Sequence, residues 1–197
     1  KFYVHGEVLN LKSGSAKDKI DAAMKSLVES VYSKLNMVNQ FADTDADVFS
    51  IFNSPQDEIT FTGLGANNED ALNDISQWLE LRSQKMLKTS MGDVQDRYQK
   101  IPYGWKEIDI AALIARLIVQ QKIQINYGGA MVGKDDRRLV DYLRKKSEIY
   151  NAIVVRHIAP DETLIRKSVA FLREYLGAMD IPSDENGLIG FVLNTFE

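Results

Sequence analysis

The sequence predicts a mainly helical α+β protein, in which amphipathic helices accompany a small helix and strand unit of winged-helix-like character. Several stretches carry apolar residues at three- and four-residue spacing, the period of a helix that packs one face on a core. Within residues 90–160, helical stretches alternate with two short stretches of β pattern. The elements follow in the order helix, helix, strand, glycine turn, helix and strand. So many elements in so short a segment indicate one compact unit, although their order is not the standard one.

Composition allows one substantial core or two small ones. The 197 residues are 45% apolar and carry a net charge of -4, so the whole chain has no electrostatic preference for nucleic acid or an anionic membrane. Basic residues nevertheless outnumber acidic ones between residues 100 and 157. Because the chain has no cysteine and no long apolar run, we expect a cytoplasmic protein without disulfides or membrane spans. It opens at Lys1 rather than Met, so we expect a segment of a longer protein.

Residues 1–89 predict an N-terminal helical region with short strands. Loose alternation over residues 2–11 suggests an edge strand. Ser15 and Asp18 form a capping box, and the apolar spacing that follows predicts one helix of about six turns, as far as Val38.

The rest of this region divides into a loop and a second helix. Residues 42–65 are polar and interrupted by Pro and Gly, which predicts a loop with one short strand at 59–61. Residues 68–88 predict a helix whose acidic first turn and basic last turn suit the helix dipole. The polar break at 89–92 is the predicted boundary to the next region.

Residues 90–160 form the predicted winged-helix-like unit. A short helix ends at Lys100, and the turn Ile-Pro-Tyr-Gly-Trp at 101–105 leads into a helix over 107–121. That helix is apolar on nearly every side, which is typical of a buried helix, so we expect a core element that is poorly suited to reading DNA.

A strand, a glycine turn, a helix and a second strand complete the unit. Alternation of Ile and Tyr with polar residues over 123–127 predicts a half-buried strand that ends at a Gly-Gly pair. A helix is predicted to begin near Asp135, and residues 152–158 predict a second strand. Residues 161–197 form the third region, with one helix over 161–176 and a last helix from about 183 that the chain end interrupts.

The stretch 128–135 (GGAMVGKD) satisfies G-x-x-x-x-G-K. In a phosphate loop the next residue is Ser or Thr, whose hydroxyl holds Mg²⁺, whereas here Asp135 and Asp136 follow Lys134. Two carboxylates beside a polyphosphate would repel it. We therefore interpret the stretch as a glycine-rich wing or turn, and a degenerate phosphate site remains only as a third hypothesis.

Metal and nucleophile motifs are equally incomplete. Three aspartates at 43, 45 and 47 imitate the start of a calcium loop, but Val48 stands where that loop needs Gly. Two histidines without any cysteine provide no zinc ligand set. We therefore expect no catalytic residue, no cofactor and no metal in this segment.

Basic residues near the predicted third helix of the unit are candidates for contact with nucleic-acid phosphates. The candidates are Lys134, Arg137, Arg138, Arg144, Lys145 and Lys146. Basic side chains beside a wing bind phosphates with little sequence preference. Acidic residues lie on the same helix, where i,i+4 neighbours neutralise one another. A solvated face of mixed charge and a non-specific phosphate contact therefore both remain open.

Three features together resemble a known family. They are the Pro-Tyr-Gly-Trp turn, the apolar helix that leads to a Lys-Ile-Gln-Ile strand, and the D-x-x-x-L-V-D-Y-L pattern from Asp135. Residues 89–174 thereby resemble the region beyond the ATPase core in the large P-loop protein of BREX phage-defence systems (BrxC/PglY). The resemblance implies a very large parent with an AAA-like ATPase module, which works with a methyltransferase and other partners to restrict phage. No complete Walker motif is present, so the family's nucleotide-binding residues have no counterpart here.

Three functions follow as hypotheses. The first is a non-catalytic segment of a phage-defence ATPase that serves assembly or coupling to partner proteins or DNA. The second is a winged-helix-like module that binds double-stranded DNA non-specifically, and the third is an enzyme with a degenerate phosphate site. The resemblance implies other subunits of the defence complex as partners, and we expect neither a membrane nor a small-molecule substrate.

Overall fold

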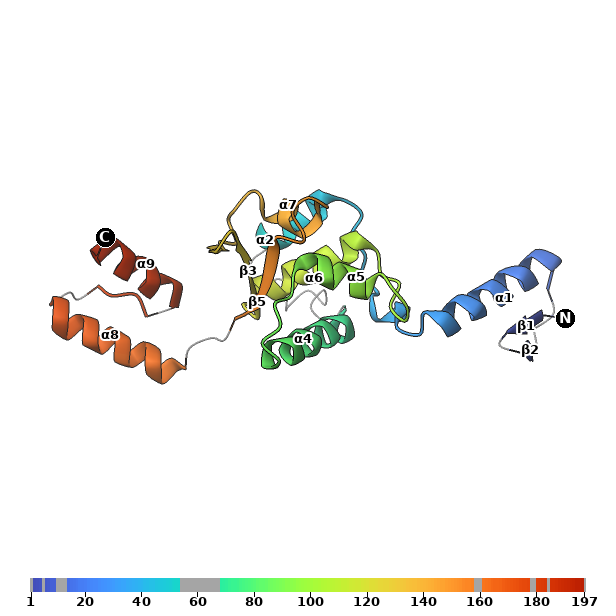
Figure 1. Cartoon of the computed structure of the whole chain (residues 1–197), viewed down its shortest axis with the longest axis horizontal. Coiled ribbons are helices and arrows are strands. Elements are labelled where there is room, and N and C mark those ends of the chain that lie inside the picture. The colour runs from blue at the N-terminus through green and yellow to red at the C-terminus, as the bar shows by residue number, and fades with distance from the viewer. Residues whose placement is uncertain are drawn as a thin grey trace. The chain divides into compact units, whose positions relative to one another are not determined.

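The computed structural model describes residues 2–4, 6–9, 14–53, 68–157, 161–177, 180–183 and 185–196. The chain divides into two compact units, residues 1–156 and 157–197. Helices predominate and the strands are short and antiparallel, which confirms the predicted fold class (Figure 1). Of the helices in the described ranges, none is long and apolar enough to cross a membrane. The three-part division at residues 90 and 161 stays a prediction.

The first unit begins with a hairpin and a helix. Strands β1 (Phe2–Val4) and β2 (Glu7–Leu9) pair antiparallel around Gly6, so the prediction of a single edge strand is wrong. Gly6 has a φ of 85°, a conformation that glycine adopts without strain. Helix α1 (Ala16–Val31) begins at the predicted capping box of Ser15 and Asp18.

Helix α1 ends at Val31 rather than at the predicted Val38, and a short 3-10 helix, η1 (Leu35–Met37), follows. The backbone of Lys34 explains the break. Its N–H donates to the turn at 101–105 and its carbonyl accepts from the same turn, at 3.0 Å in both hydrogen bonds. Tertiary hydrogen bonds therefore outweigh a helical apolar period that continues beyond Val31.

Helix α2 (Asp45–Asn53) occupies a stretch where the sequence predicted a loop. The carboxylate of Asp47 accepts the backbone N–H groups of Asp43 and Thr44, at 3.0 and 2.8 Å, and so satisfies donors at the start of the helix. Val48 is fully buried in the main core. A local cap and burial in the core together stabilise a helix that the polar sequence did not predict.

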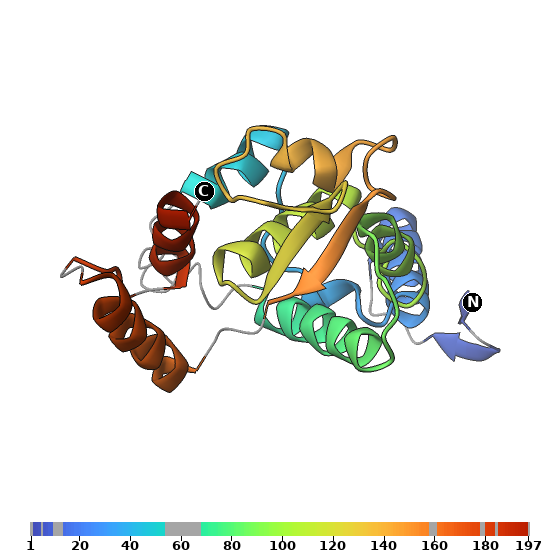
Figure 2. The same cartoon turned by 60° about the vertical axis from the view of Figure 1, so that its left-hand side comes forward.

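Three predicted helices are confirmed to within about one turn. They are α4 (Glu69–Gln84), α5 (Met91–Tyr98) and α6 (Glu107–Val119). In Figure 1 and Figure 2, α6 lies at the centre of the unit, with α4 on one side and α2 and α7 (Leu139–Arg144) on the other. The strand predicted at 59–61 lies outside the described residues.

A three-stranded antiparallel sheet follows α6, in the order β4 (Ala130–Val132), β3 (Ile123–Tyr127) and β5 (Ala152–Arg156). Strands β3 and β5 were predicted, whereas β4 was not. Gly128 and Gly129 have φ values of 63° and 91°, the positive values that a two-residue hairpin turn requires. The prediction of a glycine-rich wing or turn is therefore confirmed.

Residues 133–151, which we call the wing segment, connect β4 to β5 and contain α7. This helix begins at Leu139, although the sequence predicted a start near Asp135. The carboxylate of Asp136 accepts the backbone N–H of Arg138 at 2.7 Å, and such a bond favours a turn over a helix.

The second unit contains α8 (Glu162–Leu176) and α9 (Glu185–Phe196), both close to their predicted positions. Gly177 ends α8 with a φ of 64°, as a left-handed C-cap. A small apolar cluster lies at the centre of this unit and contains Val169, Leu172, Ile181 and Leu188.

Candidate partner and nucleic-acid interface

Helix α6 follows another helix and a turn and precedes a hairpin, the place of the helix that reads DNA in a helix-turn-helix protein. No residue from 107 to 119 is exposed. Its Asp109 is only 3% exposed and accepts the backbone N–H of Ala42 at 2.8 Å. Burial raises the pKa of Asp109, although the hydrogen bond from Ala42 acts in the other direction. Eight residues of α6 are buried and five are half-buried, so no face of the helix is fully exposed, which agrees with the prediction of a core helix.

The carboxylate of Asp74 joins segments that are distant in the sequence. It accepts hydrogen bonds from Lys34 Nζ at 2.5 Å, from the Tyr103 hydroxyl at 2.8 Å and from the Tyr98 hydroxyl at 3.1 Å. Burial alone would raise the pKa of Asp74, but these bonds outweigh it and place the pKa below the ordinary 3.8. The same contact raises the pKa of Lys34. We call these four residues the Asp74 cluster.

The turn at 101–105 packs beside this cluster. The rings of Tyr98 and Trp105 stack with their centroids 4.8 Å apart and their planes at 8°. Gly104 has a φ of 67°, and a Cβ at this position would lie 2.5 Å from the Tyr32 ring. The most distinctive sequence motif is therefore a joint that holds α5, α6 and the end of α1 together.

All six basic candidates lie in the wing segment, but two of them are engaged by carboxylates. Arg144 is half-buried and forms an ion pair with Asp45 of α2. Lys145 forms an i,i+4 ion pair with Asp141 at 2.7 Å. Arg144 therefore connects the wing segment to α2, whereas the ion pair of Lys145 lies within the segment.

The remaining four candidates, Lys134, Arg137, Arg138 and Lys146, are exposed. The Arg138 guanidinium lies over the Tyr142 ring, 5.1 Å from its centroid. Among the residues that the structure describes, none forms an ion pair with Lys134, Arg137 or Lys146. Three cations can therefore meet a phosphate, whereas a dedicated DNA surface is usually a larger basic patch.

The stretch 128–135 does not have the shape of a phosphate loop. Such a loop passes directly from a strand into a helix and turns its amides toward the phosphates. Here Met131 and Val132 pair with β3, and the next helix begins only at Leu139. Of the aspartates near residue 45, Asp47 caps α2. Within the described ranges, no three His, Cys, Asp or Glu side chains are grouped as a metal site.

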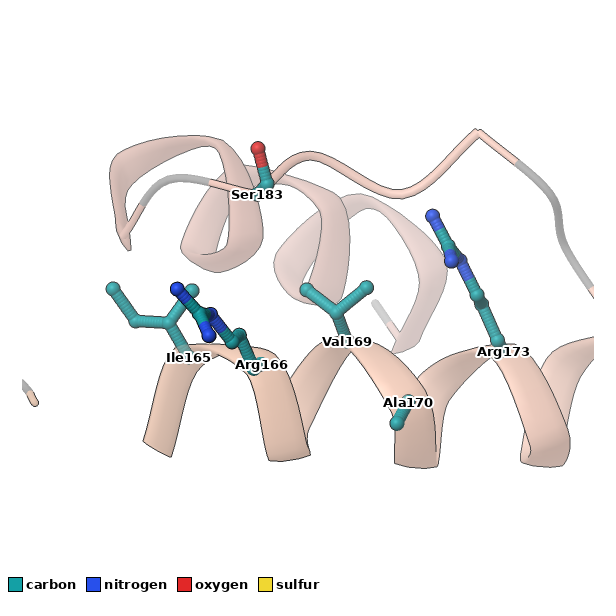
Figure 3. A pocket seen from close by; sticks show the side chains of 6 residues that line it. All are labelled: Ile165, Arg166, Val169, Ala170, Arg173 and Ser183. Atoms are coloured by element: carbon teal, nitrogen blue, oxygen red, sulfur yellow. The ribbon is translucent and has the colours of Figure 1, made fainter. Parts of the chain in front are cut away.

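Sequence reasoning missed a cleft in the second unit, which has a volume of about 530 Å³ (Figure 3). Its walls come from α8 and from the segment that precedes α9. The described residues that line it are Ile165, Arg166, Val169, Ala170, Arg173 and Ser183. Helical periodicity places the α8 residues near one another, but only the fold brings Ser183 opposite them.

A pair of helices joined by a turn and followed by a hairpin in a small antiparallel sheet defines a winged-helix protein. Residues 34–158 match the family model for the winged helix-turn-helix domain of the BREX ATP-binding protein BrxC. Because this match covers more than half of the chain, the chain belongs to that family, and the predicted resemblance is confirmed. No solved structure matches the chain. The match excludes α1 and nearly all of the second unit.

Proposed function

We propose that this winged helix is a non-catalytic segment of a BREX ATPase that serves the assembly of the ATPase with other protein subunits, in the cytoplasm. The observation that carries the proposal is the burial of α6, of which no residue is exposed. A helix without an exposed face cannot enter a major groove. The fold then serves as a scaffold whose outer surfaces are left for protein contacts.

Even without α2 in contact with it, α6 would not be suited to recognise DNA bases. Its buried residues are mostly aliphatic, including Ile110, Leu113 and Leu117, and aliphatic side chains supply none of the hydrogen bonds that distinguish bases. The clustered charges of the core, such as Lys34 and Asp74, already have partners within the chain. Both observations favour a protein partner over sequence-specific DNA recognition.

Non-specific contact with DNA is the second candidate function. Its support is the exposure of Lys134, Arg137 and Lys146 without an ion pair to any described residue. Such a contact would involve phosphates only, so its affinity would fall steeply as salt concentration rises.

Fluorescence anisotropy with a short duplex of arbitrary sequence separates the two candidates. The chain would be titrated at about 50 and 200 mM salt, the range over which phosphate contacts lose most affinity. We expect no binding at either concentration. Micromolar binding that disappears at the higher salt and in a Lys134→Glu, Arg137→Glu, Lys146→Glu variant would replace the assembly proposal with DNA contact.

The same triple variant can be tested in the whole defence system. Cells that carry the complete system with the altered protein would be challenged with phage, and the plating efficiency would be measured. Assembly predicts unchanged protection, because the wing cations take no part in it. Loss of protection with normal protein levels would contradict the proposal.

A further inference from the structure

Strand β5 is an outer strand of the three-stranded sheet, and the segment before α5 pairs with part of its outer edge. The backbone N–H of Val154 donates to the carbonyl of Thr89 at 2.8 Å. Next to this bond, Ser90 lies opposite Ile153 in an antiparallel bridge. The first half of the edge is therefore covered by the chain itself.

The pairing stops before the strand ends. Because alternate residues of a strand direct their backbone groups to the same side, the carbonyl of Val154 and the N–H of Arg156 both face this outer edge. Neither group has a hydrogen-bond partner in the part of the chain that the structure describes. The chain turns away because the N–H of Leu87 donates to the carbonyl of Arg82, at 3.0 Å, at the end of α4. One acceptor and one donor are thus left unpaired on either side of Val155.

A cleft of about 210 Å³ lies at this point, between the end of α4 and β5. Helix α4 lies beside β5 in both views of the chain (Figure 1 and Figure 2). Val155 and Arg156 line one side of the cleft, and Met86 and Leu87 line the other. Met86 is 93% exposed and Leu87 is 49% exposed. Apolar side chains are therefore exposed directly beside the unpaired backbone groups.

We propose that this β5 cleft binds an extended apolar segment of a partner protein, which adds a strand to the edge of the sheet. The partner residue opposite Val155 donates its N–H to the carbonyl of Val154, and its carbonyl accepts the N–H of Arg156. Its apolar side chain lies in the cleft beside Met86 and Leu87. The inference rests on the proposed function, because assembly requires a protein partner, and it specifies how that partner binds.

The backbone groups of the cleft favour a peptide over nucleic acid. A neighbouring donor and acceptor match the N–H and carbonyl of one extended residue, whereas a phosphate carries acceptors and would leave the carbonyl of Val154 unpaired. The exposed Met86 and Leu87 also favour an apolar occupant, since their contact with water ends when the cleft is filled.

Charge complementarity adds a second feature of the partner. Lys88 lines the cleft, is exposed and forms no ion pair with another described residue. A carboxylate near the apolar anchor of the partner segment can pair with this ammonium group. The expected segment therefore combines an apolar residue with a neighbouring acidic one in an extended strand.

Backbone methylation of a peptide tests the strand addition with the full chain. The probe is a fluorescein-labelled peptide of seven residues, with leucine at its centre, glutamate next to the leucine, and valine and threonine elsewhere. We expect saturable binding by fluorescence anisotropy. A methyl group on the leucine nitrogen removes the donor to Val154 and should weaken binding at least about fivefold. A methyl group on the next nitrogen, which faces away from β5, should change the affinity by about twofold or less.

Two substitutions at Arg156 test the same bond from the side of the protein. Arg156→Pro removes the backbone N–H and places the proline ring at the open edge, whereas Arg156→Ala keeps the N–H. Both variants lose the ion pair with Glu80, so their difference isolates the backbone group. Arg156→Pro should bind the peptide at least about tenfold more weakly than Arg156→Ala. Thermal unfolding checks that both variants are folded, and if Arg156→Pro is not, the two methylated peptides decide the question alone.

A charge reversal tests the acidic feature of the partner. Lys88→Glu should lower the affinity for the peptide about threefold or more, because it places two carboxylates together. Lys85→Glu is the matched control, since Lys85 is exposed near the same helix end but does not line the cleft, and it should keep the affinity to within about twofold. Equal losses in the two variants would remove the acidic residue from the proposal.

Three results would overturn the strand addition. They are no binding of the unmethylated peptide, equal effects of methylation at the two nitrogens, and equal affinities of folded Arg156→Pro and Arg156→Ala. Any of them leaves the assembly proposal intact, because that proposal fails only through DNA binding or through loss of protection in the wing variants.

Discussion

In the Asp74 cluster, Lys34 and Asp74 lie 2.5 Å apart, with side chains 40% and 15% exposed, and two tyrosine hydroxyls complete the hydrogen bonds of the carboxylate. In the wing segment, Lys134, Arg137 and Lys146 are exposed and have no ionic partner among the described residues. The difference shows that charge in this protein has two uses. Paired charges fix the winged-helix core, whereas these three wing cations remain exposed.

The largest effect should come from the core that surrounds α6. Leu117 is fully buried, and Leu117→Ala should lower the free energy of unfolding by about 2–5 kcal/mol, because it leaves a cavity in a packed core. Leu81→Ala is the control, since Leu81 is 55% exposed on α4 and should cost about 0.5 kcal/mol or less. Urea denaturation measures both, and similar losses would contradict the central place of α6.

Asp74→Ala should have the next largest effect. It removes the acceptor of three hydrogen bonds, one of them from the charged Lys34, and should cost about 1.5–3 kcal/mol. Lys134→Ala in the wing segment is the matched control and should change stability by about 0.5 kcal/mol or less. If the two variants lost equal free energy of unfolding, the paired charges would stabilise the fold no more than the exposed ones, which would contradict the comparison.

The pH dependence of stability sharpens the same contrast. The pKa of Asp74 is lower in the folded chain than its ordinary value of 3.8, so its contribution is fully present above that value. It is lost as the pH falls below 3.8 and through the folded pKa. Denaturation of wild type and Asp74→Asn between neutral and strongly acidic pH should show a smaller loss in the variant. Parallel curves would mean that the Asp74 carboxylate is not held by its hydrogen bonds.

Gly104→Ala should have an intermediate to small effect on the free energy of unfolding. The positive φ and the close approach of the Tyr32 ring both oppose a Cβ, with a cost of about 1–3 kcal/mol. Gly133→Ala is its control, because a Cβ there meets nothing within 4 Å. Thermal unfolding compares the two, and an unchanged midpoint for Gly104→Ala would contradict the role of the turn as a joint.

The smallest effect on stability is expected in the wing segment. Arg137→Glu and Lys146→Glu together should change the free energy of unfolding by about 0.5 kcal/mol or less, as exposed substitutions usually do. Arg144→Ala is the informative comparison, because it breaks the ion pair with Asp45 and should destabilise the chain more. If the double variant at Arg137 and Lys146 lost more free energy of unfolding than Arg144→Ala, these two cations would have partners that stabilise the fold.

Much of the fold could be predicted because its signals are local. The apolar sequence of α6 indicated a buried helix, the alternation in β3 indicated a strand, and the Gly-Gly pair indicated the turn that ends it. Helix α2 was missed because its start depends on one Asp47 cap and its stability on contact with a core distant in sequence. The overlong prediction for α1 has the same cause, since the backbone of Lys34 is held by the turn at 101–105.

The candidate interface was less predictable because it depends on long-range pairing. The ion pair of Lys145 and Asp141 follows from i,i+4 spacing, whereas the partners of Arg144, which are Asp45 and Glu107, are far away in the sequence. No local pattern distinguishes a paired arginine from an exposed one such as Arg137. The cleft of the second unit was missed because Ser183 reaches its place only through the fold.

Thiol labelling of α6 tests the central claim most directly, because the natural chain contains no cysteine. Single cysteines would replace Ala111, Ala112 or Ala115 of α6 and, as an exposed reference, Ala22 of α1. Successive helical positions turn by about 100°, so the three α6 alanines sample more than one side of the helix. A sequestered α6 predicts that all three react more slowly with a water-soluble thiol reagent than the Ala22→Cys reference. Reaction of any of the three as fast as that reference, in a protein that remains folded, would contradict it.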